Sequence, residues 1–237
     1  MPDTPPPPEV AADEVDDGSF ELAMFPLGSV LFPSVLLPLH VFEPRYRAMT
    51  RHCLDATPEF GVVLIERGHE VGGGDVRTPV GTVARIIEAA ELDDGRWVLA
   101  TVGTRRVRVL RWLDDAPWPR AMVADVVDEP VADADAAAAA WSALQPRLRR
   151  VLALASELGE AAAPATVELA DDPGLGSFQA AALAPIGPAD QQRLLGAAGP
   201  DERLAVLDEL LTGAAELLEA RLAMGNDDDG DIAWPGP

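Results

Sequence analysis

The chain has 237 residues and a mass of 25.0 kDa, enough for one large domain or two small ones. Its hydrophobic fraction of 48% favours a globular fold, and no run approaches the roughly 18 consecutive apolar residues of a membrane helix. The first residues contain neither a basic region nor an apolar core, so we expect no secretory signal and a cytoplasmic location. The single cysteine, Cys53, has no internal disulfide partner, which fits a reducing compartment.

The charge is strongly unbalanced, with 40 acidic residues against 18 lysines and arginines and a formal net charge of −22. Such a surface repels phosphates, so we expect no nucleic acid among the partners. The lack of a long apolar run predicts no membrane among them either. All 18 of those basic residues are arginines. The absence of lysine excludes a P-loop nucleotide site and a serine–lysine protease, because both need the lysine amine.

The two ends of the chain have the composition of disordered segments. Residues 1–19 are rich in proline, aspartate and alanine, and residues 225–237 carry four aspartates among glycines. Between them the hydrophobic pattern changes once, near residue 130. We therefore predict a β-rich subdomain over 20–130 and a helical subdomain over 131–224.

Valine-rich runs separated by turn residues predict strands in the first subdomain. Asp93, Asp94 and Gly95 favour a hairpin, since Gly95 tolerates a positive φ. A second turn is expected near Gly103, between two strands. Pro44 opens a helix whose apolar residues recur every three or four positions. The expected strands cover 60–65, 80–92, 97–102 and 107–113.

The second subdomain shows helical periodicity in alanine- and leucine-rich sequence. Pro146 interrupts the first pattern and must either kink that helix or open a new one. A shorter helix is expected around 190–198, and Pro200 suits the first turn of the last one. The two apolar stripes are Trp141, Leu144, Leu148, Val151, Ala155 and Leu158, and then Leu204, Leu207, Leu211, Ala214, Leu218 and Leu222. The chain as a whole is therefore predicted to be α+β.

Residues 25–46, FPLGSVLFPSVLLPLHVFEPRY, carry a dense motif. They resemble the opening signature of the Lon protease N-terminal domain family, in which a proline-rich start is followed by V-L-F-P and P-L-x-I/V-F-E-x-R-Y. Segments 60–65, 80–86, 95–96 and 103–106 follow the family order, and 191–195 and 202–204 do so more weakly. The matching positions of the signature are Pro26, Leu27, Val30, Leu31, Phe32, Pro33, Pro38, Leu39, Val41, Phe42, Glu43, Arg45 and Tyr46.

This resemblance covers roughly residues 20–223. It implies a PUA-like, twisted β pseudo-barrel followed by an α-helical bundle, a domain that grips unfolded or tagged substrates in full Lon proteases. After Ala223 there is no room for an ATPase or a peptidase domain, so the inherited role is expected to be binding alone.

No residue set predicts catalysis. His52 and Cys53 are adjacent on a predicted helix and point about 100° apart, so they cannot share a proton as base and nucleophile. The three histidines, His40, His52 and His69, have no metal-like spacing, and we expect no metal or cofactor. No helix that begins with a lysine follows the glycine-rich residues 68–75. A flexible loop is therefore a simpler interpretation of this segment than a phosphate-binding loop.

Five residues are the candidate binding residues: Phe42, Arg45, Tyr46, Trp97 and Arg105. Phe42, Arg45 and Tyr46 lie at the entry of the predicted helix, where the charged group either ties the helix to neighbouring backbone or meets a ligand. Trp97 would anchor a peptide if exposed. Arg105, like Arg106 beside it, either receives an acidic partner or caps loop carbonyls.

The leading functional hypothesis is a non-catalytic module that binds unfolded or extended polypeptide, alone or beside a separate protease or ATPase. An exposed strand edge would supply backbone hydrogen bonds to such a segment, and the acidic surface would favour basic clients. The alternative is a small-molecule-binding PUA-like domain, with the ligand in the cleft beside the helices. A third hypothesis, a hydrolase using Cys53 or a serine, has the least support. The oligomeric state and the client stay open.

Overall fold

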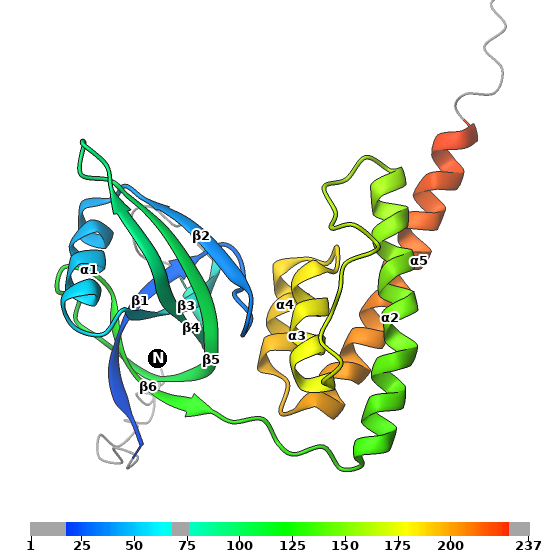
Figure 1. Ribbon diagram of the computed structural model, residues 1–237, viewed down its shortest axis with the longest axis horizontal. Coiled ribbons are helices and arrows are strands. Elements are labelled where there is room, and N and C mark those ends of the chain that lie inside the picture. The colour runs from blue at the N-terminus through cyan, green and yellow to red at the C-terminus, as the bar shows by residue number, and fades with distance from the viewer. Residues whose placement is uncertain (1–17, 68–75, 228–237) are drawn as a thin grey trace, which may run out of the picture.

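The computed structural model describes residues 18–67 and 76–227. The predictions for 1–17, for the glycine-rich residues 68–75 with His69, and for 228–237 lie outside these residues. The described chain forms a β-barrel lobe followed by a helical lobe (Figure 1). The predicted α+β fold is confirmed.

The barrel lobe contains one mixed sheet in the order β2-β5-β4-β3-β1-β6. β6 also pairs with β5, so the sheet curls back on itself. β1 and β3 are parallel, and the other pairs are antiparallel. The strands are β1 (Phe20–Leu27), β2 (Leu36–Val41), β3 (Glu59–Arg67), β4 (Val76–Glu91), β5 (Trp97–Leu113) and β6 (Arg120–Val126).

The expected turn near Gly103 is wrong, because β5 runs without a break from Trp97 to Leu113. Its first part pairs with β2 and its second part with β6, while β4 lies along both. A bulge in the β4–β5 register falls between Thr82 and Ala84, opposite Gly103. A bulge bends a ladder without ending it, so the glycine marks a bend of the barrel wall.

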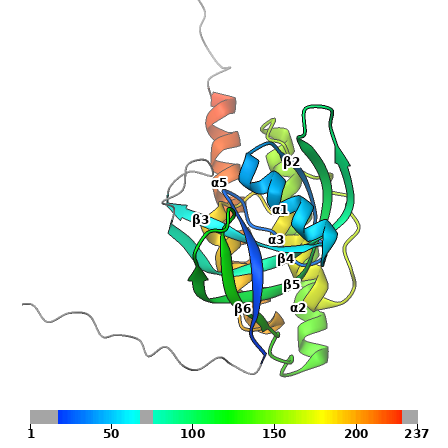
Figure 2. The ribbon, with the colours of Figure 1, turned by 90° about the vertical axis from the view of Figure 1, so that its left-hand side faces the viewer.

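The predicted hairpin is confirmed at Gly95, whose φ is +78°. The helix that Pro44 opens is α1 (Pro44–Asp55), which lies across the barrel in the view of Figure 2. Tyr46, Met49 and Cys53 face inward from α1 and join one barrel core with Phe25 and Phe60. Pro44 and the helical periodicity together therefore located both α1 and its buried side.

The helical lobe contains α2 (Ala134–Glu157), α3 (Pro173–Leu183), α4 (Pro188–Gly196) and α5 (Pro200–Asp227). α2 packs along α5, and α3 and α4 lie between that pair and the barrel (Figure 1). Pro146 lies inside α2 without ending it. Pro146 and Ser142 one turn earlier are both solvent-exposed, so water can satisfy the carbonyl that loses its hydrogen bond.

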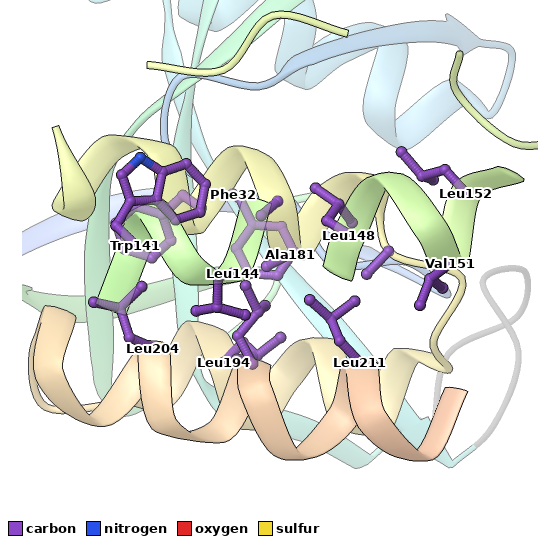
Figure 3. Packing of buried hydrophobic residues seen from close by; sticks show 14 of the residues in the cluster. Phe32, Trp141, Leu144, Leu148, Val151, Leu152, Ala181, Leu194, Leu204 and Leu211 are labelled. Atoms are coloured by element: carbon purple, nitrogen blue, oxygen red, sulfur yellow. The ribbon is translucent and has the colours of Figure 1, made fainter. Parts of the chain in front are cut away.

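A single hydrophobic core joins the helices to one side of the barrel. Its apolar side chains interdigitate between α2, α3 and α5, as the labelled residues in Figure 3 show. Phe32 from the barrel is fully buried in it, and its ring lies 6.1 Å from that of Phe178 on α3. Val80 on β4 also belongs to this core. The lobes are thus packed against each other through apolar contacts.

Candidate functional site

The outward side of β2 is apolar and exposed. Successive side chains of a strand point to opposite faces of the sheet. In β2 the inward-pointing series ends at Val41, which is buried. Leu36 is 68% exposed and Phe42, just beyond the strand, is 55% exposed. Pro38 and His40 lie on the same outward side. The side chains that contact the barrel core from β2, Leu37 and Leu39, are the alternate ones.

The outward side of β5 continues this surface. Val98, which is 46% exposed, lies opposite His40, Ala100 lies opposite Pro38, and Val102 lies opposite Leu36. We call the set Leu36, Pro38, His40, Phe42, Val98, Ala100 and Val102 the apolar sheet face. Contiguous exposed apolar residues of this kind mark binding surfaces more often than single ones do.

The apolar sheet face ends at a free strand edge. Among residues 18–67 and 76–227, β5 is the one strand that pairs with β2. The Gly103 amide donates to the Val35 carbonyl, so the alternating ladder leaves the backbone groups of Leu36, Pro38 and His40 turned away from β5. Pro38 has no N–H, so the centre of this edge cannot donate a hydrogen bond. Strand addition, the mechanism expected from the sequence, is therefore restricted here to the amides of Leu36 and His40.

The five predicted binding residues are not brought together. Phe42 lies on the apolar sheet face. Tyr46 is only 3% exposed and stacks on Phe25 with ring centroids 4.2 Å apart, and Trp97 is 9% exposed on the inward side of β5. Tyr46 and Trp97 are core residues in this structure, so their placement does not support the prediction that they contact a partner. Tyr46 lies on the inward side of α1 and Trp97 on the inward side of β5, so the hydrophobic period of each element explains its burial.

Arg45 and Arg105 both pair with acids of their own lobe. The Arg45 Nε donates to Glu43 at 3.1 Å, beside the first turn of α1. Arg105 donates to Glu59 and Asp125, each at 2.9 Å. Burial opposes ionisation of Glu59, but hydrogen bonds from Arg105 and Arg85 outweigh it and hold the pKa of Glu59 below its ordinary value. Arg105 is thus part of a barrel ion network.

Arg106 caps carbonyls, which was one of the two alternatives left open for it. It is 3% exposed and donates to the carbonyls of Leu195 and Ala197, at the C-terminal end of α4. A cation at that end is favoured by the helix dipole. Asp128 and Arg203 complete this contact, and the sequence analysis missed both of them. No spacing signal could have found them, since they are 75 residues apart in the chain.

The catalytic alternatives gain no support from the geometry. Burial raises the pKa of the Cys53 thiol to about 11, which opposes a reactive thiolate. The His52 ring instead lies 5.0 Å from the Trp118 ring. In the described part of the chain, no group of three or more His, Cys, Asp or Glu side chains could hold a metal ion. Nor is any helix there long and apolar enough to cross a membrane.

The cavities are open depressions. One of about 410 Å³ is lined by His52, Trp118 and Arg120, and one of about 370 Å³ lies between the barrel and α4 beside Thr78 and Gln192. A third, of about 510 Å³, follows alanines of α2 and α5. The first places the Trp118 ring beside His52, Glu21 and Arg120, whereas no aromatic side chain of the described residues lines the other two. Small-molecule sites are lined mainly by apolar and aromatic side chains with a few converging polar groups.

A family model for the ATP-dependent protease La (LON) substrate-binding domain matches residues 21–213. The chain belongs to the Lon substrate-binding domain family. It is 30% identical over 201 residues to the Lon protease of Anaeromyxobacter dehalogenans and to Lon protease 2 of Myxococcus xanthus, covering 84% of this chain in each case. It spans 24% of the length of each of these relatives.

Solved structures agree with this assignment to the Lon family. The Lon N-terminal domain protein from Xanthomonas campestris is 29% identical, with a TM-score of 0.57, over 79% of this chain and 96% of that one. The N-terminal domain of the Mycobacterium avium complex Lon protease is 15% identical, with a TM-score of 0.60, over 81% and 98%, which shows the shared fold. Membership supports a substrate-binding role, and the family is one of non-catalytic domains.

Proposed function

We propose that this Lon-type domain holds extended, partly apolar polypeptide segments on the apolar sheet face without transforming them. The observation that carries the proposal is the exposure of Leu36, Phe42 and Val98 on two paired strands that end at a free edge. Apolar side chains of a client would pack on this surface, while the few free backbone groups of β2 would align its chain.

The electrostatics favour basic clients. The formal net charge is −22. Glu88 on β4 lies opposite Ala100 of β5, at the border of the apolar sheet face. Long-range attraction of a basic segment accelerates its encounter, and salt screens that attraction. A separate protease or ATPase that receives the bound segment is part of this proposal.

The test uses fluorescent extended peptides that alternate apolar residues with either arginine or glutamate. The native protein should bind the arginine series saturably at micromolar strength, and the double variant Leu36→Ser/Val98→Thr should bind about tenfold more weakly, since two apolar contacts are lost. Leu110→Ser/Val127→Thr is the matched control, because it removes the same two residue types at exposed positions outside this surface. Equal weakening by both variants, or no saturable binding by the native protein, would refute the proposal.

A further inference from the structure

One acidic side chain joins two buried arginines from different lobes. Asp128 lies in the segment between β6 and α2. One of its carboxylate oxygens accepts a hydrogen bond from Arg106 on β5, and the other accepts one from Arg203 on α5 at 2.8 Å. Arg203 is 0% exposed and Arg106 is 3% exposed, whereas 29% of the Asp128 side chain remains exposed.

This trio carries one more positive than negative charge. Arg106 Nη1 also donates to the carbonyls of Leu195 and Ala197 at the end of α4. Arg203 Nε donates to Ser177 Oγ at 2.8 Å, and Arg203 Nη2 also donates to the Gly174 carbonyl at 3.3 Å. Because a buried guanidinium without a counterion is costly, both arginines depend on the same carboxylate. Loss of Asp128 leaves two such groups, while loss of either arginine leaves a neutral pair.

The trio is connected to the start of β2. The Arg203 guanidinium lies over the Phe178 ring, 3.6 Å from its centroid, and the Phe178 ring packs on Phe32. Phe32 precedes β2, where Val35 also packs against the helical core and Leu36 opens the apolar sheet face. Arg106 is on the same strand as Val98 and Val102. The contacts of the trio therefore run from the helices to both strands of that surface.

The segment around Asp128 has other attachments to the helical lobe. The Glu129 amide donates to the Ala198 carbonyl at 2.9 Å, and the Ala132 amide donates to Asp201 at 2.9 Å. These bonds fix the segment to the turn between α4 and α5 and to the first turn of α5. Within this segment the Asp128 side chain binds Arg106 of β5, which also donates directly to the carbonyls of Leu195 and Ala197.

We infer that Asp128 is a positioning residue that fixes the barrel and the helical lobe at one relative orientation. It does so by neutralising Arg106 and Arg203 together. Its effect on client binding rests on the proposed function, whereas its effect on the lobes does not.

The orientation can be measured with spin labels on Asp93→Cys in the β4–β5 hairpin and Ser142→Cys on α2, both exposed positions, in a Cys53→Ala background. With Asp128 present we expect one narrow distance distribution. Asp128→Asn should at least double its width and raise the unfolding equilibrium constant about 100-fold, since it leaves two buried charges unpaired. Asp125→Asn is the matched control: it breaks the exposed pair with Arg105 and should leave the distribution narrow.

A second variant covers the case in which Asp128→Asn does not fold. Arg106→Met/Arg203→Met removes both buried charges and leaves Asp128 partly solvated, so it should fold and still broaden the distribution. An unchanged width in this variant, or in a folded Asp128→Asn protein, overturns the inference. Peptide affinity is read in parallel. A broadened distribution with unchanged affinity supports the role of Asp128 and counts against the apolar sheet face as the binding site.

Discussion

Pro38 on β2 lies directly opposite Ala100 on β5, at a position where the β2 backbone turns away from its partner strand. Pro38 therefore removes a hydrogen-bond donor from the free edge of β2, while every hydrogen bond between β2 and β5 can still form. Proline at such a place costs the sheet nothing and discourages a second strand from pairing there. The edge of β2 is thus protected at its centre, beside an apolar surface that remains exposed.

Pro38→Val should restore a donor to this edge and increase concentration-dependent association of the protein. Sedimentation velocity at rising concentration measures this, and the free energy of unfolding should change by less than about 1 kcal/mol, because no ladder bond is involved. Adding Leu36→Lys to the same strand should reverse the association, since an edge charge opposes strand pairing. A Pro38→Val protein that associates no more than the native protein would show that something other than the proline protects the edge.

Gly95→Ala should destabilise the protein by about 1–2 kcal/mol in urea unfolding. The residue has a φ of +78°, and an added Cβ would lie 2.1 Å from the Arg47 Nη2 atom that packs on the hairpin. Gly213→Ala is the opposite case, since this residue lies inside α5 with nothing within 4 Å of the added atom. It should stabilise the protein by up to ~1 kcal/mol. If both substitutions changed the free energy of unfolding in the same direction, the explanation from backbone conformation would be wrong.

Glu59→Gln should remove part of the acid sensitivity of the fold. The folded-state pKa of Glu59 is lowered, so its ionised form stabilises the native state above the ordinary glutamate pKa of about 4.3, and that contribution is lost as the pH falls through the lower folded value. We expect a loss of about 1 kcal/mol at pH 7 that shrinks towards pH 3. Urea unfolding across this range measures it, with the exposed Glu157→Gln as control. A loss that is constant with pH would rule out the ion network as its cause.

The Cys53 thiol should react with a disulfide reagent at pH 8 at least about 100-fold more slowly than an exposed thiol. Its pKa is raised to about 11 by burial on the inward side of α1, so both the thiolate fraction and access are low. The Ser142→Cys/Cys53→Ala variant supplies the exposed reference. Urea should bring the rate of Cys53 up to that reference in step with unfolding. Fast labelling of the native protein would instead show that Cys53 is accessible and reactive in the folded state.

Sequence patterns located the regular elements with well-defined periods. The hairpin glycine, α1 behind Pro44 and the stripes of α2 and α5 were predicted because each depends on residues that are close along the chain. The break near Gly103 was wrong because local composition cannot distinguish a bend within a long strand from a turn between two short ones. β5 is continuous since β4 continues to pair with it past the glycine.

The candidate site was predicted only in part. Phe42 was named, but Leu36 and Val98 were not, although the alternation in LLPLHV marks an outward side of β2. Which side faces solvent depends on the pairing of β2 with β5, and these strands are about 60 residues apart in the chain. The same pairing turned Trp97 inward and left Val98 exposed.

The sequence by itself determined the family, the α+β class, the exclusion of lysine-dependent chemistry and the acidic surface. All of these depend on residue types and on spacings along the chain. Only the tertiary structure decided that Asp128 holds Arg106 and Arg203 together, that the edge of β2 is blocked at Pro38, and that Tyr46 and Trp97 are buried. These features depend on which distant segments meet, and that is settled by long-range packing and strand pairing, for which no local pattern carries a signal.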